Sequence, residues 1–281
     1  MALIENKFWG VEDKVAIAIE RLQEFEPAEG YYLAFSGGKD SQTIYHLAQM
    51  AGVKFDAHYH LTTVDPPELV YFIREQYPDV IIDRPEKTMW ELVEKKGFPT
   101  RLARWCCSEL KEGGGEGRIT VTGVRWAESN ARRQRKPLEI VTKKKADKML
   151  FDDNDEGRRM FENCTVKGKR VVNPIIDWQD VDVWEFINVI LDIPYCKLYD
   201  EGFTRLGCIG CPIAQNQRLK HFERWPKYKG AYMRAFARYF PGYLSRCAER
   251  AYTPKFQTLE AAWAWWLEDH DPDPDQTVLF E

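Results

Sequence analysis

The chain has 281 residues, enough to bury a full core in one large domain or in one domain with a smaller appendage. Hydrophobic residues make up 44% of the sequence, and no apolar run reaches the roughly 18 residues that a membrane helix requires. The first residues also lack the basic start and apolar stretch of a signal peptide, so we expect a cytoplasmic protein with no membrane partner.

The net charge of -4 conceals two basic stretches. Residues 118–148 hold ten Lys and Arg against three Asp and Glu, and residues 218–250 hold nine against two. The two stretches together carry about +14, which leaves about -18 for the rest of the chain. A basic stretch is commonly a solvated surface, but two of them favour a polyanionic partner such as a nucleic acid.

Short apolar runs alternate with segments of helical spacing over the first two thirds of the chain. The expected strands are 31–35, 54–61, 80–83, 119–124 and 171–176, and the expected helices are 11–25, 41–51, 68–77, 87–96 and 181–191. This alternation predicts an α/β fold with a doubly wound, mostly parallel sheet that helices cover on both faces.

The pattern changes past residue 193. A loop rich in glycine and cysteine, Gly202–Pro212, leads into a helical part that is rich in Trp, Tyr and Arg. We therefore predict an α/β domain over residues 1–193 and a cysteine-loop and helical region over residues 194–281. Within the first domain, the charged segment 142–168 is expected to be an irregular, mobile insertion. The acidic segment from Asp269 is expected to fray.

Ser36-Gly-Gly-Lys-Asp-Ser41 lies between the first long strand and the helix that follows it, where open α/β sheets bind ligands. Its two glycines permit a sharp turn whose N–H groups point at a phosphate, and the helix adds its positive end. Lys39 would neutralise charge on the departing phosphates, and Asp40 would bind Mg²⁺ or order the loop. The alternative is a turn that uses the glycines for geometry alone.

The loop motif SGGxDS resembles the pyrophosphate loop of the N-type ATP pyrophosphatases, the PP-loop superfamily, and it lacks the spacing of a Walker A loop. The resemblance implies that the protein binds ATP with Mg²⁺, releases pyrophosphate and adenylates a substrate atom. The nucleotide-binding residues that it implies in the loop are Ser36, Gly37, Gly38, Lys39, Asp40 and Ser41.

Seven cysteines are unevenly placed, which in a reducing compartment favours metal or redox chemistry over disulfides. Cys106-Cys107 and Cys208-Ile-Gly-Cys211 together offer four soft thiolate ligands, which select an iron–sulfur cluster or zinc. Adjacent cysteines point in divergent directions, so we favour a [4Fe-4S] cluster over a closed tetrahedral zinc site. Cys196 is a candidate to replace one of the adjacent pair, which would leave a free, sulfur-carrying thiol. Ordinary thiols are expected at Cys164 and Cys247.

Three segments resemble the phosphoadenosine phosphosulfate (PAPS) reductase family, in particular its iron–sulfur branch: Arg104–Lys111, Thr122–Ser129 and Leu198–Cys211. The resemblance covers roughly residues 30 to 212 and implies a fold like that of the adenine nucleotide alpha hydrolases. It implies that Cys106, Cys107, Cys208 and Cys211 hold the cluster. The residues expected near the nucleotide or its substrate are Thr62, Gly123, Arg125 and Arg132, and those expected to be catalytic are Lys39, Asp40 and Arg125. A surface ion pair is the alternative for Arg125.

One feature of the reductases is missing here, a catalytic cysteine near the C-terminus in a Glu-Cys-Gly-(Leu/Ile)-His context. The last cysteine of this chain, Cys247, lies in Ser-Arg-Cys-Ala-Glu. The sequence therefore resembles the DNA phosphorothioation ATP pyrophosphatases and the cluster-dependent tRNA thiolases more than the true sulfonucleotide reductases.

The sequence thus predicts an ATP-dependent sulfurtransferase that adenylates a nucleic acid and inserts sulfur from the cluster or from a persulfidated cysteine. A cysteine desulfurase is the expected type of sulfur donor, and the oligomeric state is open. The nucleic acid is expected to lie across Arg132–Lys136, Lys143–Lys145 and the C-terminal helices that contain Trp225, Tyr228, Tyr232 and Arg234. Core packing is the alternative role of these aromatic side chains.

Two other functions are compatible with the sequence. The first is a reductase of adenylyl sulfate or PAPS that draws on an external thiol. The second, from a different class, is a non-catalytic nucleic-acid-binding module that keeps the fold and a structural zinc.

Overall fold

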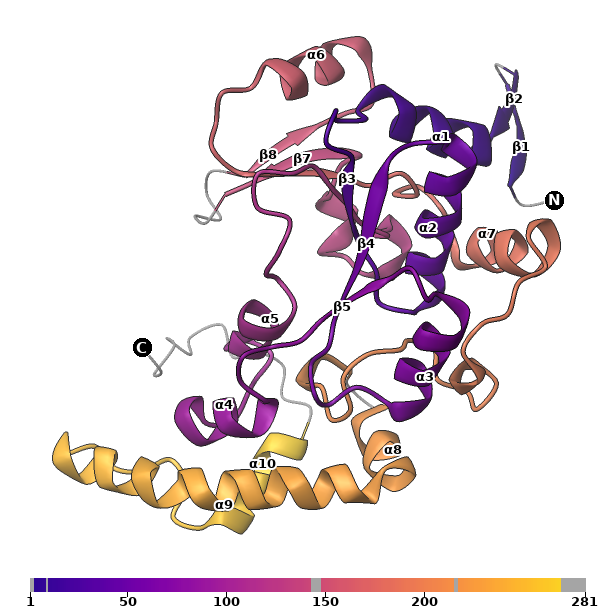
Figure 1. Ribbon diagram of the computed structural model, residues 1–281. Helices are drawn as coiled ribbons and strands as arrows, with labels where there is room; N and C mark the ends of the chain where they lie inside the picture. Colours follow the sequence, from indigo (N-terminus) through magenta and orange to yellow (C-terminus); the bar gives the residue numbers. More distant parts are fainter. Residues whose placement is uncertain (1–2, 9, 143–147, 215–216, 269–281) are drawn as a thin grey trace. The chain divides into compact units, whose positions relative to one another are not determined.

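The computed structural model describes residues 3–8, 10–142, 148–214 and 217–268. It divides into two compact units, each assembled from separate stretches of chain (Figure 1). Unit 1 consists of Met1–Tyr59, Glu68–Asp83 and Gly114–Leu206, and unit 2 consists of His60–Pro67, Arg84–Gly113 and Gly207–Glu281. A single boundary at residues 193 and 194 does not describe these units, because two earlier stretches of chain fold with the C-terminal helices.

A seven-stranded sheet forms the centre of unit 1, in the order β5-β4-β3-β6-β9-β7-β8. The bounds are β3 Tyr31–Ala34, β4 Phe55–His60, β5 Ile81–Asp83, β6 Thr120–Val121, β7 Leu138–Val141, β8 Met149–Phe151 and β9 Lys169–Val172. β3 pairs in parallel with β4 and β6, and β6 pairs in parallel with β9. β7 runs antiparallel to β8 and β9. The predicted α/β fold with a mostly parallel sheet is confirmed.

Five helices accompany the sheet in unit 1. They are α1 Lys14–Glu24, α2 Lys39–Ala51, α3 Pro67–Gln76, α6 Asp155–Asn163 and α7 Asp180–Glu185. α2 packs against both α1 and α7. The chain of α7 continues as a π-helical turn, Phe186–Ile190, so the helix expected over 181–191 is present but changes its winding.

A hairpin of two short strands, β1 Ile4–Lys7 and β2 Gly10–Asp13, precedes α1. The first helix was expected from residue 11 but begins at Lys14. The reason is Asp13, whose carboxylate accepts hydrogen bonds from the amides of Val15 and Ala16 and so caps the helix.

The segment 142–168 was expected to be irregular, and this prediction is wrong for residues 149–151 and 155–163. It contains β8, which pairs with β7, and α6, which Asn154 caps by accepting a hydrogen bond from the amide of Gly157. Phe161 of α6 is buried against Phe25, with ring centroids 5.4 Å apart. The segment is therefore part of the core of unit 1. Residues 143–147 lie outside the described part of the chain.

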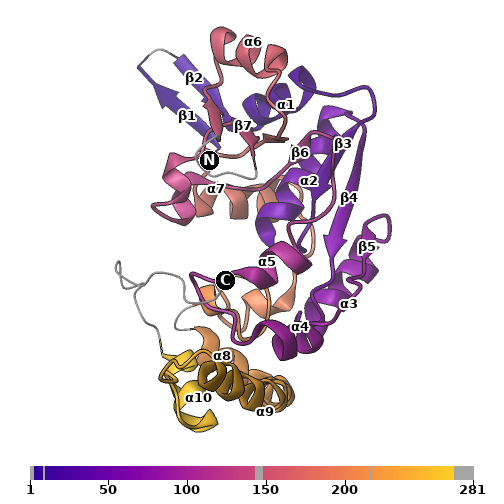
Figure 2. The same cartoon turned by 90° about the vertical axis from the view of Figure 1, so that its left-hand side faces the viewer.

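Unit 2 is helical, as the sequence predicted for the C-terminal part (Figure 2). Its helices are α4 Met89–Lys96, α5 Trp105–Leu110, α8 Gln217–Arg224, α9 Pro226–Glu249 and α10 Leu259–Leu267. α9 packs against α4, α8 and α10. Phe98 stacks on Phe236 at 3.8 Å between centroids, and the indole N–H of Trp266 donates to the carbonyl of Pro99. None of the helices in the described ranges is long and apolar enough to cross a membrane.

The turn from β3 into α2 requires glycine at residue 37. Gly37 has a φ of +72°, and a Cβ atom there would lie 2.7 Å from Ile73 and 2.8 Å from Leu69, both on α3. Gly52, which ends α2 at a φ of +69°, has no atom within 4 Å of the position of a Cβ. The two glycines share a left-handed backbone but differ in the space around them.

This difference predicts unequal effects of alanine at the two positions. Gly52→Ala should lower the free energy of unfolding by about 1 kcal/mol, the cost of a left-handed alanine. Gly37→Ala should lower it by about 1–3 kcal/mol more, because the new methyl group overlaps Ile73 and Leu69. Urea unfolding curves of the two variants measure the difference. Equal losses of unfolding free energy would show that α3 shifts to accept the methyl group and that steric crowding does not require glycine at residue 37.

Candidate functional site

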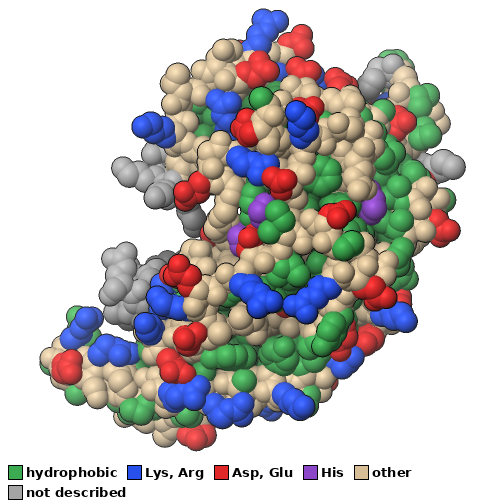
Figure 3. Space-filling model, viewed as in Figure 1, with side chains coloured by type: hydrophobic (Ala, Val, Ile, Leu, Met, Phe, Trp, Pro, Cys, Tyr) green, Lys and Arg blue, Asp and Glu red, His purple; other side chains and the backbone are tan. Residues whose placement is uncertain are grey.

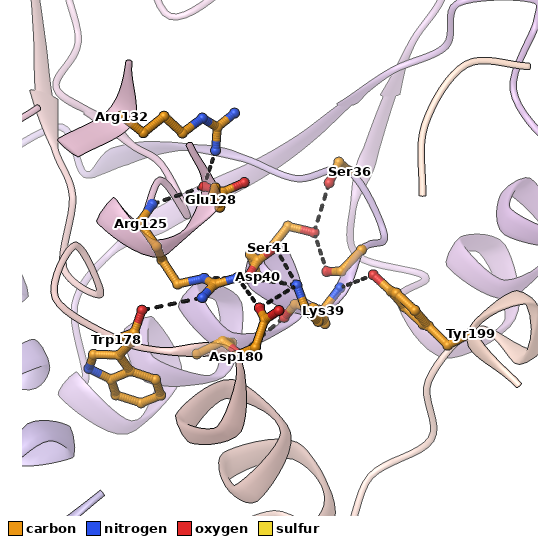
Figure 4. Close-up of polar contacts among 12 residues, drawn as sticks. Ser36, Lys39, Asp40, Ser41, Arg125, Glu128, Arg132, Trp178, Asp180 and Tyr199 are labelled. Atoms are coloured by element: carbon orange, nitrogen blue, oxygen red, sulfur yellow. Dashed lines mark hydrogen bonds and ion pairs between the residues drawn. The ribbon is translucent and has the colours of Figure 1, made fainter. Parts of the chain in front are cut away.

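The first feature of the site is the start of α2 (Figure 4). Gly38 is its N-cap in an extended conformation and has no side chain to satisfy the first amides of the helix. The hydroxyl of Ser36 donates to that of Ser41 at 3.2 Å, and the hydroxyl of Ser41 donates to the carbonyl of Gly38 at 2.8 Å. These bonds fix the turn at the start of the helix, a position where backbone N–H groups commonly bind anions.

Four charged side chains meet beside this turn (Figure 4). Arg125 is 1% exposed; its Nε lies 2.7 Å from Oδ1 of Asp40 and its Nη2 lies 2.6 Å from Oδ1 of Asp180. The Nζ of Lys39 lies 3.2 Å from Asp40 and 3.3 Å from Asp180. Arg125 also donates to the carbonyl of Trp178. The Arg125 guanidinium is thus buried within a charged network, so the alternative of a surface ion pair is wrong.

The ion pairs favour the charged forms of Arg125 and Asp180. Burial disfavours the Arg125 guanidinium, but Asp40 and Asp180 outweigh burial and raise its pKa above the ordinary value. Burial likewise disfavours the Asp180 carboxylate, but Lys39 and Arg125 outweigh it and lower the pKa of Asp180. The site therefore combines two basic side chains, which suit a phosphate, with two acidic side chains, which suit a divalent cation.

Asp180 was not among the residues singled out in the sequence. It opens the helix expected after the strand at 171–176, and an acidic residue just past a strand of the central sheet was an available signal. The side chain of Asp180 is 70% exposed, whereas that of Arg125 is buried. Asp180 is consequently the member of the network that solvent or a ligand reaches most readily.

Two further predicted residues join the site indirectly. The guanidinium of Arg132 donates to Glu128, and the same carboxylate accepts the backbone N–H of Arg125 at 2.9 Å. A Cβ atom at Gly123 would lie 2.8 Å from the carbonyl of Asp40, so glycine allows the chain after β6 to approach α2. Both residues therefore support the positions of Arg125 and Asp40.

Thr62 belongs to unit 2 and has a different set of partners. Its hydroxyl accepts a hydrogen bond from the thiol of Cys208 at 3.3 Å, and its backbone N–H donates to Asp65 at 2.6 Å. The structure thus places Thr62 with the cysteines of unit 2, and its expected contact with the nucleotide stays a prediction.

Four cysteines form the second feature, within unit 2. Cys106 and Cys107 lie in α5, and the hydrogen bond between them, burial, and the nearby Cys208 and Cys211 all raise the pKa of Cys106. The hydrogen bond from Cys106 lowers the pKa of Cys107, and Arg104, 3.5 Å from its sulfur, lowers it further. The two pairs that are distant in the sequence are therefore neighbours in space.

All seven cysteines are free thiols, and Cys196 is buried in unit 1, apart from the four that unit 2 assembles. Within the described ranges, no three or more His, Cys, Asp and Glu side chains are placed so that they could hold a metal ion. The cysteine group is a set of neighbouring donors and not a closed coordination shell.

Several basic side chains in the described part of the stretch at residues 118–148 form ion pairs. These pairs are Arg118–Asp56, Arg132–Glu128, Arg135–Glu139, Lys136–Asp152 and Lys148–Glu139. The expectation that a nucleic acid lies across Arg132–Lys136 stays a prediction, and Lys143–Lys145 lie outside the described residues.

The aromatic residues proposed for base stacking are mostly core residues. Trp225 is 7% exposed and Tyr232 is 1% exposed, and the hydroxyl of Tyr232 donates to the carbonyl of Ile209. Tyr228 is half-buried and donates to the carbonyl of Asp65. The core-packing alternative holds for Trp225 and Tyr232, because a buried ring offers no face to a base.

Comparison with known proteins gives relatives of moderate similarity. The chain is 27% identical over 235 residues to an uncharacterized protein of Methanocaldococcus jannaschii, covering 77% of this chain and 50% of that protein. It is 28% identical over 193 residues to a probable FAD synthase of Caenorhabditis elegans (67% and 31% covered). It is 27% identical over 172 residues to an adenosine 5'-phosphosulfate reductase of Staphylococcus epidermidis (58% and 60% covered). The chain spans half of the first relative and about a third of the second.

Among solved structures, PAPS reductase from Candida auris aligns with 68% of this chain and 87% of its own, with a TM-score of 0.45 and 17% identity. The family model described as the phosphoadenosine phosphosulfate reductase domain matches residues 30–214. That range contains the turn at Gly37 and Gly38, the buried Arg125, and both cysteine pairs. The chain therefore belongs to the PAPS reductase family.

Proposed function

We propose that the protein is an ATP pyrophosphatase that adenylates a substrate. The observation that supports this most strongly is the start of α2, where the first amides of the helix, the Lys39 side chain and the buried Arg125 converge beside two carboxylates. Such a site suits a triphosphate with a divalent cation better than a monoanion, because it offers several donors and metal-binding oxygens at once. The names of two relatives, FAD synthase and adenosine 5'-phosphosulfate reductase, also refer to adenine nucleotides.

The chemistry would follow from this arrangement. A substrate oxygen attacks the α-phosphorus of ATP, the bond from that phosphorus to the bridging oxygen breaks, and pyrophosphate leaves. Lys39 and the amides of the turn neutralise the charge that develops on the leaving group. Asp40, with Asp180 beside it, would supply oxygen ligands to Mg²⁺, and Arg125 would keep both carboxylates in place.

Lys39→Ala is expected to lower the rate of pyrophosphate release from ATP about 10²-fold to 10³-fold, because a buried charge-stabilising donor is lost. A coupled pyrophosphate assay measures this rate. Lys96→Ala is the matched control, because Lys96 pairs with Glu109 on unit 2 and should leave turnover unchanged. An unchanged rate in Lys39→Ala, with its unfolding curve intact, contradicts the proposed site.

The cysteine group of unit 2 is proposed to hold a [4Fe-4S] cluster. Four neighbouring thiols are the donor set of such a cluster, and two cations, Arg104 beside Cys107 and Lys111 beside Cys208, would balance the charge of bound thiolates. The ligands would be Cys106, Cys107, Cys208 and Cys211. When bound, the cluster would serve the proposed sulfurtransferase as a carrier of sulfur or electrons, with a cysteine desulfurase as the external donor.

Cys208→Ser should remove most of the iron and acid-labile sulfide from anaerobically purified protein, because one of four ligands is lost. Cys247→Ser is the control and should keep both, because Cys247 lies on α9 and outside the group. Iron and sulfide assays with an absorption spectrum measure the outcome. Colourless wild-type protein that contains zinc would instead support the binding module with a structural zinc.

A nucleic acid is proposed as the acceptor, and α9 is proposed as the surface that binds it. Lys227, Arg234 and Arg238 are exposed and recur at spacings of seven and four residues, which places them on one side of the helix. Figure 3 shows Lys and Arg side chains following α9 along one edge of the molecule. Glu94, which pairs with Arg238, is one carboxylate at this side of the helix.

The double variant Lys227→Glu, Arg234→Glu should weaken binding of a single-stranded oligonucleotide by at least about 10-fold. It should also make the dependence of affinity on salt shallower, because fewer phosphates are neutralised. The control is Lys54→Glu, Lys167→Glu, which makes the same change in net charge on exposed positions of unit 1. Equal losses in the two variants would mean that net charge, and not α9, determines binding.

The family also supports a second candidate, reduction of adenylyl sulfate or PAPS with an external thiol, since one relative is an adenosine 5'-phosphosulfate reductase. The two functions differ in their products. Sulfite from adenylyl sulfate and thioredoxin would favour the reductase, whereas pyrophosphate from ATP favours the adenylating enzyme.

A further inference from the structure

Tyr199 lies beside the start of α2, on the opposite side from Arg125 (Figure 4). It ends a 3-10 turn, Lys197–Tyr199, and its hydroxyl oxygen accepts a hydrogen bond from the backbone N–H of Lys39 at 2.9 Å. A Cβ atom at Gly38 would lie 3.3 Å from the same hydroxyl. Glycine at residue 38 therefore leaves the room that the Tyr199 hydroxyl occupies.

The bond partner of Tyr199 is one of the groups that bind phosphate at a helix start. The amide of Lys39 is in the first turn of α2, where amides have no carbonyl partner within the helix. Tyr199 occupies this amide, so a phosphate that approaches the turn meets the phenol at that point. A phenol that accepts one hydrogen bond still has its own proton to donate. The site thus keeps a hydrogen-bond donor at this point: the O–H of Tyr199 takes the place of the Lys39 N–H, which the phenol oxygen has accepted.

The proton of Tyr199 is retained near neutral pH. Burial raises the pKa of Tyr199 well above its ordinary value, and the negative charge of Asp40 raises it further, although the Lys39 amide acts in the opposite direction. A neutral phenol beside an anionic ligand is a hydrogen-bond donor and adds no negative charge.

The ring of Tyr199 is fixed by other aromatic rings. Trp184 packs against it edge to face, with centroids 5.0 Å apart, and Tyr195 lies 6.3 Å away. Trp184 is on α7, the helix whose first residue is Asp180. The same short helix therefore positions both a carboxylate of the charged network and the ring that carries the phenol.

We propose that Tyr199 binds phosphate together with the loop at residues 36–41. Its hydroxyl accepts a hydrogen bond from the Lys39 amide and donates one to a phosphate oxygen of the bound nucleotide. This proposal rests on the proposed function of the loop as a triphosphate site. It adds a residue from a segment distant in sequence to the donors that the loop itself supplies.

Tyr199→Phe tests the proposal, because it removes only the hydroxyl. Its dissociation constants for pyrophosphate and for α,β-methylene ATP should rise roughly 10-fold to 100-fold, the effect of one hydrogen bond to a charged group, whereas that for adenosine should not change. Isothermal titration calorimetry measures all three. Tyr195→Phe is the control, since the Tyr195 hydroxyl bonds to Asp200 and its ring belongs to the same aromatic group.

Each other outcome counts against the proposal. Equal weakening for adenosine and pyrophosphate would show a structural role of the ring, and tighter pyrophosphate binding would show that the phenol competes with phosphate. If wild-type protein binds neither pyrophosphate nor the ATP analogue, the proposed function fails together with this inference. If wild type binds them and Tyr199→Phe binds them equally well, only the role of Tyr199 fails.

If Tyr199→Phe does not fold, the variant Gly38→Ala tests the proposal instead. Gly38→Ala adds a methyl group 3.3 Å from the hydroxyl at a backbone conformation that alanine adopts without strain, so it should displace the phenol by a few tenths of an ångström. Weaker pyrophosphate binding is expected again, and unchanged binding in this variant would overturn the proposal.

Discussion

The ion pairs of Arg125 are the interactions on which unit 1 depends. A guanidinium that is 1% exposed is tolerable only if carboxylates surround it, because a buried charge that loses a partner costs about 3–5 kcal/mol. Asp40 comes from the first turn of α2 and Asp180 from the first turn of α7. One side chain thereby fixes the start of two helices and the segment that follows β6. The buried charge of Arg125 thus also helps to position the turn from β3 into α2.

Each unit contains its own group of chemically active side chains. The charged network and Tyr199 lie within unit 1, and the four neighbouring cysteines lie within unit 2 together with Thr62, Asp65 and Lys111. The cysteine group depends on two stretches that precede the C-terminal helices, because His60–Pro67 contributes Thr62 and Arg84–Gly113 contributes the adjacent cysteines. The two groups of side chains therefore belong to different folding units, although the stretches that form each unit alternate along the sequence.

Local signals predicted the parts of this structure that local physics determines. The strand at residues 31–35 and the glycine turn into α2 were predicted closely, because apolar runs and turn residues act over a few positions. Asp180 and Tyr199 were not identified, since Asp180 lies 55 residues from Arg125 in the sequence and Tyr199 lies 160 residues from Lys39. The strands β7 and β8 were missed because they are short and depend on strand pairing, β8 with β7 and β7 with both β8 and β9. Trp225 and Tyr232 show the same limit, because aromatic residues beside arginines have the same sequence pattern in a core as on a surface.

The discontinuous make-up of unit 2 has a consequence for dissecting the molecule. A fragment that begins at Gly207 would retain α8, α9 and α10 but lose α4 and the segment with Phe98 and Pro99. The stacking partner of Phe236 and the acceptor of the Trp266 indole N–H would then be missing, and a row of aromatic rings would face water. Such a fragment would be prone to aggregate. The C-terminal helices therefore cannot be expressed as a separate domain without the earlier stretches of unit 2.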